Sequence, residues 1–382
     1  IIDTTGLTGF SVMLTGVIFT SRSWFIMLSV SILLILGIWL AFSPYGTIKL
    51  GKDNDEPEFS TVSWLSMLFA AGMGVGLLFW GTAEPLSHFN VIRGYTDNFH
   101  AAEHALFITN FHWGLHAWAI YAVTGLVMAY FSFRRGFPNL VSTPMKAVFG
   151  QHLWTKSVGW LCDLLAIYAI AIGIGGSIAM GVFQIQSGVE SLFGLSGSGL
   201  WLAVVIFVVL CMAYILPLMV DLSKGMATLS NTAMAIAGGL MIFVLLTGPT
   251  FFMMNGIIGS IGDYFFKVIP HGFQTYTLYD EQASSCFQSW TLTLRVWWFA
   301  WAPFVGVFNA RISKGRTIRE FLFGDMLVPT FFSIFWFGVF GSDGFSGVLE
   351  IEAGILEAVE TNINDITFFV LRHLPLSYLT SV

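Results

Sequence analysis

The stretch FHWGLHAWAIY at residues 111–121 and a second stretch, WWFAWAPF at residues 297–304, concentrate tryptophan at two distant places in a very apolar chain. Hydrophobic residues make up 56% of the sequence, charged residues only 10%, and the mean hydropathy is +0.78. A soluble protein of this size needs a charged surface, which this composition cannot provide. The sequence therefore predicts an all-α polytopic membrane protein with the lipid bilayer around most of its length.

Apolar stretches near the roughly 20 residues that a helix needs to cross a bilayer recur eight times. They lie at about 24–43, 61–81, 105–131, 157–187, 198–219, 229–255, 290–310 and 320–342, and the stretch from about 366 to Val382 predicts the start of a ninth. The chain begins at Ile1 without a methionine and ends inside an apolar stretch. We therefore expect residues 1–382 to be a single, partial transmembrane domain that is cut at both ends.

The loops between these stretches alternate in their content of lysine and arginine. Basic residues stay on the cytoplasmic side during insertion, and the loop that runs from Arg311 to Arg319 is the most basic of them. This orientation makes the segments 82–104 and 256–289 outer loops. No basic tract is long enough for nucleic acid, so we expect no such partner.

The outer segment 82–104 contains several polar residues. We expect Glu84, His88 and Glu103 there to be solvated or to form hydrogen bonds within loops. His100 and His104 are given the same interpretation.

The second span contains the sequence AAGMGVG at residues 70–76, with glycine at alternate positions. Each glycine weakens a helix by roughly 1 kcal/mol relative to alanine, so the run can unwind. Unwound backbone occurs at membrane depth where protein or a cavity covers it, and its carbonyls can then bind a cation. Close helix packing through small residues is the alternative.

The tryptophan clusters also have two interpretations. On a helix, Trp297, Trp298 and Trp301 share one broad face, and Trp118 and Tyr121 share another. Tryptophan commonly anchors membrane proteins at the lipid interface. Several electron-rich rings can instead hold a cation that has no hydrogen-bond donors, such as a quaternary ammonium group.

Two further sets of polar residues lie inside predicted spans. Arg295 is about 7.5 Å deep if Trp290 marks the outer end of its helix. At that depth we expect its side chain to snorkel to the interface, with contact to an anion or substrate as the alternative. His112 and His116 are four residues apart and could reach one metal ion, but Trp113 stands where a metalloprotease has glutamate. Structural histidines, and no enzyme, are therefore favoured.

These stretches resemble the betaine/choline/carnitine family of transporters for quaternary ammonium compounds. The matching segments are residues 44–60, 72–85 (GMGVGLLFWGTAEP), 111–121, 297–306 and 309–320. The family has twelve spans, and this chain is similar to spans two to nine. The resemblance implies a LeuT-like inverted-repeat fold in a bacterial plasma membrane. It also implies import of glycine betaine or a related zwitterion by alternating access.

The resemblance further implies which residues form the site. The aromatic box of the family corresponds to Trp113, Trp118, Tyr121, Trp297, Trp298 and Trp301, and the substrate lies beside Ala71, Gly72, Gly74 and Gly76. Backbone carbonyls near Ala70 and Met73 correspond to a sodium site, so sodium is implied as a coupling ion and no other cofactor is expected. A homotrimer is the assembly that the resemblance implies.

Some positions depart from the family pattern. Ile170 and Ile174 stand where coupled members carry the threonines of a second sodium site, and Arg295 lies in a segment where members carry an aromatic residue. The coupling ion therefore stays open. A choline- or carnitine-type carrier or exchanger, and an osmolyte receptor that uses a transporter fold without transport, stay open as alternatives.

Overall fold

A computed structural model describes residues 4–74, 76–195, 199–219, 222–351, 354–361 and 363–375. Within these ranges the chain is almost entirely helical and contains no β-strand. The predicted all-α class is therefore confirmed.

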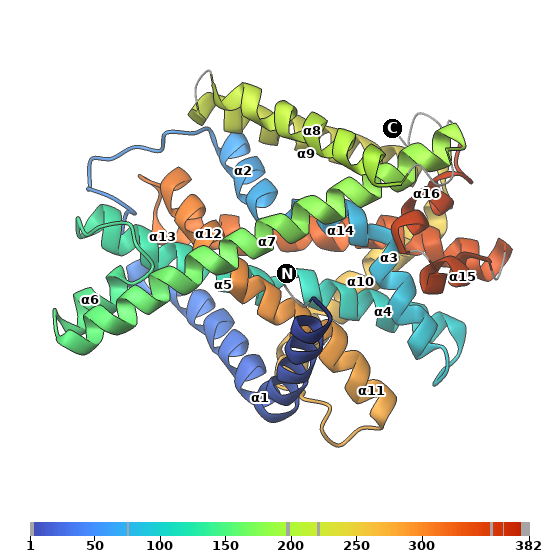
Figure 1. The fold of residues 1–382 in the computed structure, drawn as a ribbon, viewed down its shortest axis with the longest axis horizontal. Helices are drawn as coiled ribbons and strands as arrows, with labels where there is room; N and C mark the ends of the chain where they lie inside the picture. The colour runs from blue at the N-terminus through green and yellow to red at the C-terminus, as the bar shows by residue number, and fades with distance from the viewer. Residues whose placement is uncertain are drawn as a thin grey trace.

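The helices follow one another along the chain, and an extended loop over residues 43–60 leads from α1 to α2 (Figure 1). In chain order they are α1 Thr4–Phe42, α2 Thr61–Met73, α3 Gly76–Ile92, α4 Asn98–Trp113, α5 Leu115–Ala129, α6 Thr143–Phe149, α7 Leu153–Phe193, α8 Gly199–Leu218, α9 Leu222–Thr247, α10 Thr250–His271, α11 Glu281–Cys286, α12 Thr293–Ile312, α13 Ile318–Leu322, α14 Val328–Ser346, α15 Gly354–Thr361 and α16 Ile366–Leu371. A π-helical segment, η4, joins α13 to α14 over Phe323–Leu327.

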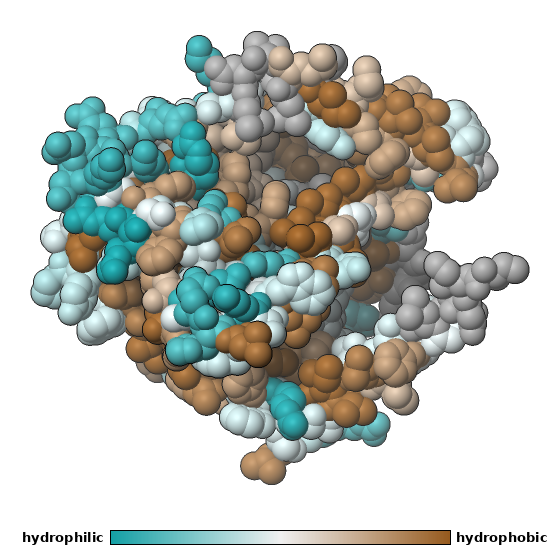
Figure 2. Space-filling model, turned by 60° about the vertical axis from the view of Figure 1, so that its left-hand side comes forward, coloured by the Kyte–Doolittle hydropathy of each residue, from teal (hydrophilic) through white to brown (hydrophobic). Residues whose placement is uncertain are grey.

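Several of these helices have the length and composition of membrane spans. Within the described ranges there are six, or seven if α2 and α3, which are inclined by 59°, count as one broken span. α1, α7 and α8 expose many large apolar side chains, and Figure 2 shows apolar residues over much of one face, with hydrophilic residues gathered toward its left-hand side. Apolar side chains on an outer surface of this extent fit contact with lipid. The chain is therefore a polytopic membrane protein.

The segment 256–289, expected to be an outer loop, is largely helical, so the prediction of a loop is wrong. α10 buries Met253, Ile257 and Tyr264 on one face and packs against α4 and α14. These positions recur at the spacing of an amphipathic helix. α10 is not among the described helices that are apolar enough to cross a membrane, so hydropathy alone does not mark it in the sequence.

The two helices that carry the tryptophan clusters lie together at the centre of the molecule. α5 and α12 make the most extensive contact of any pair of elements. A Cβ atom built on Gly125 of α5 would lie 3.3 Å from the carbonyl oxygen of Gly306 on α12. Paired glycines allow two backbones to approach this closely. α7 crosses the front of this core in Figure 1, and α8 and α9 run together along its upper edge.

Candidate functional site

The glycine run of the second span marks a break between two helices. α2 ends at Met73, Gly74 has a φ of +43°, and α3 begins at Gly76, while Val75 lies outside the described residues. Glycine adopts a positive φ at little cost, whereas other residues resist it. The N–H of Gly74 donates to the carbonyl of Ala70 at 3.3 Å. Beyond that bond, the facing helix ends leave backbone groups without intrahelical partners.

Aromatic rings from both tryptophan clusters meet beside this break. The ring of Trp298 on α12 lies 5.9 Å from Trp113, 5.5 Å from Trp118 and 4.6 Å from Tyr121, measured between centroids. All four rings are buried. Segments that are about 180 residues apart in sequence therefore form one group of rings, and these tryptophans are not anchors at the lipid interface.

A cavity of about 420 Å³ lies between the rings and the helix break. Of the residues predicted from sequence, its walls include Ala71, Gly72, Met73, Gly74, Gly76, Trp113, Tyr121, Trp297, Trp298 and Trp301. Wall residues that the sequence analysis missed include Trp80, Ser177, Cys211, Tyr214 and Leu229. The described wall residues carry no charged side chain. A ligand in this cavity meets ring faces, hydrocarbon and backbone.

Two predicted residues lie just outside these walls. Trp118 packs behind Gly72, and Ala70 precedes the first wall residue of α2. A Cβ atom on Gly72 would lie 2.5 Å from the ring of Trp118, and one on Gly76 would lie 2.9 Å from Trp113. The glycines therefore let two indole rings lie directly on the backbone, in addition to permitting the break.

Replacement of Gly72 by alanine is expected to weaken the binding of a ligand in this cavity, and so raise its apparent KM or dissociation constant, about fivefold or more. The added methyl group must displace Trp118, and overpacking of this kind typically costs about 1–3 kcal/mol. The concentration of ligand that half-saturates the variant, compared with wild type at equal amounts of protein, measures the effect. Gly175→Ala on α7 is the matched control, because nothing lies within 4 Å of its added Cβ. An unchanged KM for Gly72→Ala would show that Trp118 does not shape the site.

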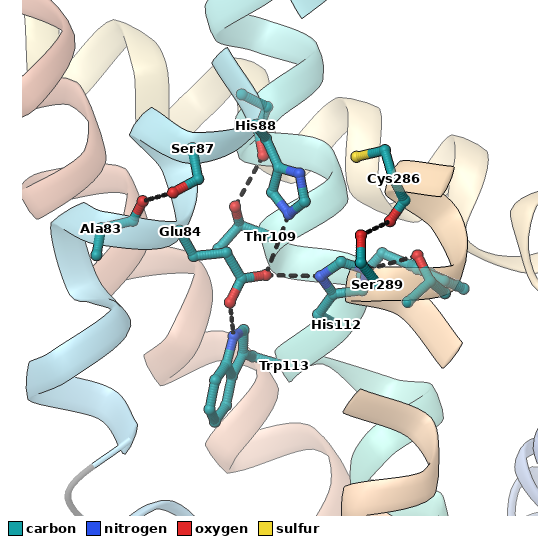
Figure 3. Close-up of polar contacts among 12 residues, drawn as sticks. Ala83, Glu84, Ser87, His88, Thr109, His112, Trp113, Cys286 and Ser289 are labelled. Carbon is teal, nitrogen blue, oxygen red and sulfur yellow. Dashed lines mark hydrogen bonds and ion pairs between the residues drawn. The ribbon is translucent and has the colours of Figure 1, made fainter. Parts of the chain in front are cut away.

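Glu84 connects the box to a buried polar network, although we expected it in a solvated loop. Its Oε2 accepts a hydrogen bond from Trp113 Nε1 at 2.7 Å, and its Oε1 accepts from His112 Nδ1 at 2.6 Å. His88 Nε2 lies 3.5 Å from the same Oε1, and His112 Nε2 lies 2.8 Å from Thr291 Oγ1. Figure 3 shows the carboxylate of Glu84, on α3, between the imidazoles of His88 and His112 and the indole of Trp113.

The expectation for Glu84 and His88 is wrong because α3 continues to Ile92 and packs along α4. Both side chains are buried within that helix pair. Glu103, in contrast, is exposed on α4, and exposed His100 bonds to Asp97, as expected.

Arg295 does not snorkel to the interface. Its side chain is fully buried, its Nη2 donates to the carbonyl of Phe111 at 2.9 Å, and its guanidinium lies 4.4 Å from the centroid of the Phe111 ring. α4 ends at Trp113 because Gly114 is not helical, so the carbonyls of its last turn need other donors. Arg295 is one of those donors, and a cation is favourable at a helix C-terminus.

His112 and His116 do not form a metal-binding pair. His112 bonds to Glu84 and Thr291, whereas His116 lies 3.5 Å from Ser31 Oγ on α1. The break at Gly114 separates the two residues onto different helices. Both are buried and serve packing and hydrogen bonding, as expected.

A second cavity, of about 250 Å³, lies on the opposite side of the Glu84 network from the box. Its walls include His88, Thr291, Tyr95, Tyr276 and Asp280. Burial raises the pKa of Tyr276 to about 12. The N–H of Ala283 lowers the pKa of Asp280, which also accepts a bond from Tyr95. At neutral pH, Asp280 is therefore charged and Tyr276 is not.

Few oxygen atoms are available for a cation near the break. Ile174 of α7 lines the cavity, and Ile170 lies one turn before it on the same helix. Neither side chain offers an oxygen. Ser177 supplies a hydroxyl group to the wall, and the last turn of α2, which contains Ala70 and Met73, supplies backbone carbonyls.

Comparison with known proteins identifies the family of the chain. The sequence profile of the betaine/carnitine/choline family of transporters matches residues 1–382. The glycine betaine transporter OpuD of Bacillus subtilis is 39% identical over 364 residues, which cover 95% of this chain and 70% of that protein. A probable glycine betaine transporter of Desulfitobacterium hafniense is 37% identical over 363 residues, with coverage of 94% and 71%.

A choline transporter is similar at nearly the same level. The osmo-independent choline transporter of Acinetobacter baylyi is 37% identical over 355 residues, which cover 92% of this chain and 67% of that protein. An uncharacterised transporter of Haemophilus influenzae is 40% identical, and the chain spans 54% of its length. The family profile and these relatives together establish that the chain belongs to the betaine/carnitine/choline transporter family.

Proposed function

We propose that this protein imports a quaternary ammonium compound, glycine betaine first, across a bacterial plasma membrane by alternating access. The observation that carries the proposal is the uncharged cavity walled by the rings of Trp113, Tyr121, Trp297, Trp298 and Trp301. A trimethylammonium group gains about 0.5–2 kcal/mol from each desolvated ring. Several such contacts suffice for a dissociation constant between micromolar and millimolar.

The cavity also discriminates between kinds of cation. A primary ammonium group would leave its hydrogen bonds unmet among rings and hydrocarbon, which costs several kcal/mol. The carboxylate of a zwitterion has a separate place, because α3 begins at Gly76 in the cavity wall. The N-terminus of a helix attracts negative charge. Betaine, which carries both groups, therefore fits the site better than choline does.

Sodium is part of the proposal as a coupling ion. The carbonyls at the end of α2, near Ala70 and Met73, would bind it beside the substrate. The broken helix supports this assignment, because carbonyls freed by a break in a spanning helix commonly bind a cation. A homotrimer, implied by the family resemblance, completes the proposal and is tested by the mass of the detergent-solubilised protein.

Uptake of radiolabelled glycine betaine into proteoliposomes tests the proposed function. We expect accumulation driven by an inward sodium gradient and at least tenfold less when potassium replaces sodium. Excess glycine, which has a primary ammonium group, should not compete, whereas choline should compete weakly. Binding without accumulation under every gradient would instead indicate a receptor, and no binding of any quaternary ammonium compound would overturn the proposal.

A further inference from the structure

A buried carboxylate, that of Asp325, lies in η4, directly after α13 and the basic loop that precedes it. Asp325 is in the π-helical segment η4, and its side chain has no exposed surface. It takes part in no ion pair among the residues that the structure describes. π-Helical segments inside α-helices frequently mark functional positions. The burial of the Asp325 carboxylate without an ion pair therefore needs a physical explanation.

The hydrogen-bond partner of Asp325 is the amide of Asn309 on α12. Asn309 Nδ2 lies 3.0 Å from one carboxylate oxygen and 3.1 Å from the other. Asn309 Oδ1 is buried and has no donor among the described residues. If the amide turns over, this oxygen faces the carboxyl group and accepts a hydrogen bond from a protonated Asp325. The pair can thus accommodate both the charged and the neutral acid.

The charged groups on elements next to η4 are engaged elsewhere. Arg319 of α13 donates to the carbonyl of Ala41 at 2.8 Å, and Glu320 caps the start of its own helix. Arg311 pairs with an exposed glutamate at 2.7 Å, and Arg316 stacks on the ring of a tryptophan at 3.9 Å.

The remaining neighbours of η4 bring no positive charge close to Asp325. α1 packs on η4 through the rings of Phe42 and Phe323, and its arginine, Arg22, lies about five helical turns before Phe42. α2 packs against η4 and contains no titratable residue. α5 contributes the neutral phenol of Tyr121, which lies within electrostatic range of Asp325. On α14, Asp343 lies at the opposite end of the helix, and His116 at the start of α5 is turned toward α1.

An unpaired carboxylate in this environment is costly to keep charged. Removing an ion from water costs several kcal/mol even after relaxation, and a buried acid avoids that cost by binding a proton. The amide of Asn309 lies within hydrogen-bond distance of both carboxyl oxygens of Asp325, a geometry that suits the charged acid and, with the amide turned over, the protonated acid. Intramembrane carboxyl groups in transporters commonly carry protons.

The position of the pair connects it to the substrate site. Asn309 lies on α12, which also carries Trp298, and η4 packs against α5, which carries Tyr121. Asp325 lies seven residues, or about 10 Å, along the helix from Ile318, the first residue of α13. A shift between α5 and α12 as the cavity opens would change the contact between Asn309 and Asp325.

We propose that Asp325 and Asn309 form a proton-binding site of the transport cycle, in addition to the sodium position at the end of α2. The carboxylate takes up one proton from external water while the site is open outward, holds it as a neutral acid while the site is closed, and returns it to water when the site opens toward the cytoplasm. This inference rests on the proposed transport of a quaternary ammonium compound.

Asp325→Asn tests the site with a neutral side chain of the same shape. We expect this variant to bind betaine within about twofold of wild type, measured by tryptophan fluorescence of the purified protein. Uptake driven by an inward proton gradient at constant sodium should fall at least tenfold, while exchange of labelled for unlabelled betaine without a gradient is retained. Asp343→Asn, which neutralises a buried acid at the other end of α14, is the matched control and should behave like wild type.

A measurement on the wild-type protein keeps the test independent of the variant's folding. Betaine added to protein in weakly buffered detergent solution should change the number of bound protons, followed with a pH indicator dye. Betaine binding with no proton response, or a variant with wild-type proton-driven uptake, overturns the assignment of Asp325. A wild-type protein that binds no betaine contradicts the proposed function itself.

Discussion

Replacement of Trp298 by alanine is expected to lower glycine betaine uptake at least tenfold, which corresponds to about 1.4 kcal/mol of binding free energy. Trp298 is only 3% exposed, and its ring contacts Trp113, Trp118 and Tyr121. The substitution removes one face of the box and also the ring against which the other three are packed. Uptake of radiolabelled betaine, normalised to the amount of protein in the membrane, measures the loss.

Two companion variants separate the role of the box from general damage. Trp298→Phe keeps a ring face of smaller area, so its uptake should fall between those of wild type and Trp298→Ala. Trp160→Ala on α7 removes a tryptophan that is 64% exposed and lies outside the cavity, and it should leave uptake unchanged. Wild-type uptake by Trp298→Ala would remove the aromatic box from the proposed mechanism.

The glycine break and the ring cluster are the parts of the site that sequence reasoning could reach. The tendency of residues 70–76 to unwind is a local property, because alternate glycines weaken a helix regardless of what surrounds it. Helical spacing alone predicts which residues share a helix face with Trp298 and which share one with Trp118. That the two faces meet does not follow from spacing, and the family resemblance was needed to predict it.

The polar residues were misplaced because their partners lie far away in sequence. Glu84 and His88 are four residues apart on α3, a spacing that already indicates a paired helix face. Their further partner, His112, is on α4, and hydropathy gives no sign of that contact. Arg295 shows the same limitation. Counting residues along its own helix gives its depth but not its partners, because the carbonyls that it binds are those of α4, where Gly114 ends the helix.

Replacement of Glu84 by alanine is expected to lower uptake about thirtyfold or more and to destabilise the protein. The indole N–H of Trp113 and the ring N–H of His112 would each lose their buried acceptor, at about 1–3 kcal/mol each. Freed from that bond, Trp113 can turn out of the box. The KM for betaine and the thermal unfolding temperature in detergent measure the two effects.

Glu84→Gln determines whether the carboxylate acts by its shape or by its charge. The side-chain carbonyl of the glutamine can accept the hydrogen bond from Trp113. Its amide N–H can donate to His112 Nδ1 if the imidazole proton moves from Nδ1 to Nε2. Thr291 Oγ1, 2.8 Å from Nε2, can accept a hydrogen bond from that proton. Uptake by Glu84→Gln should therefore stay within about threefold of wild type. Glu103→Ala, which removes an exposed acid from α4, is the control for lost charge. If Glu84→Gln were as impaired as Glu84→Ala, the negative charge behind Trp113 would be what the site requires, since that charge strengthens the attraction of the indole for a cation.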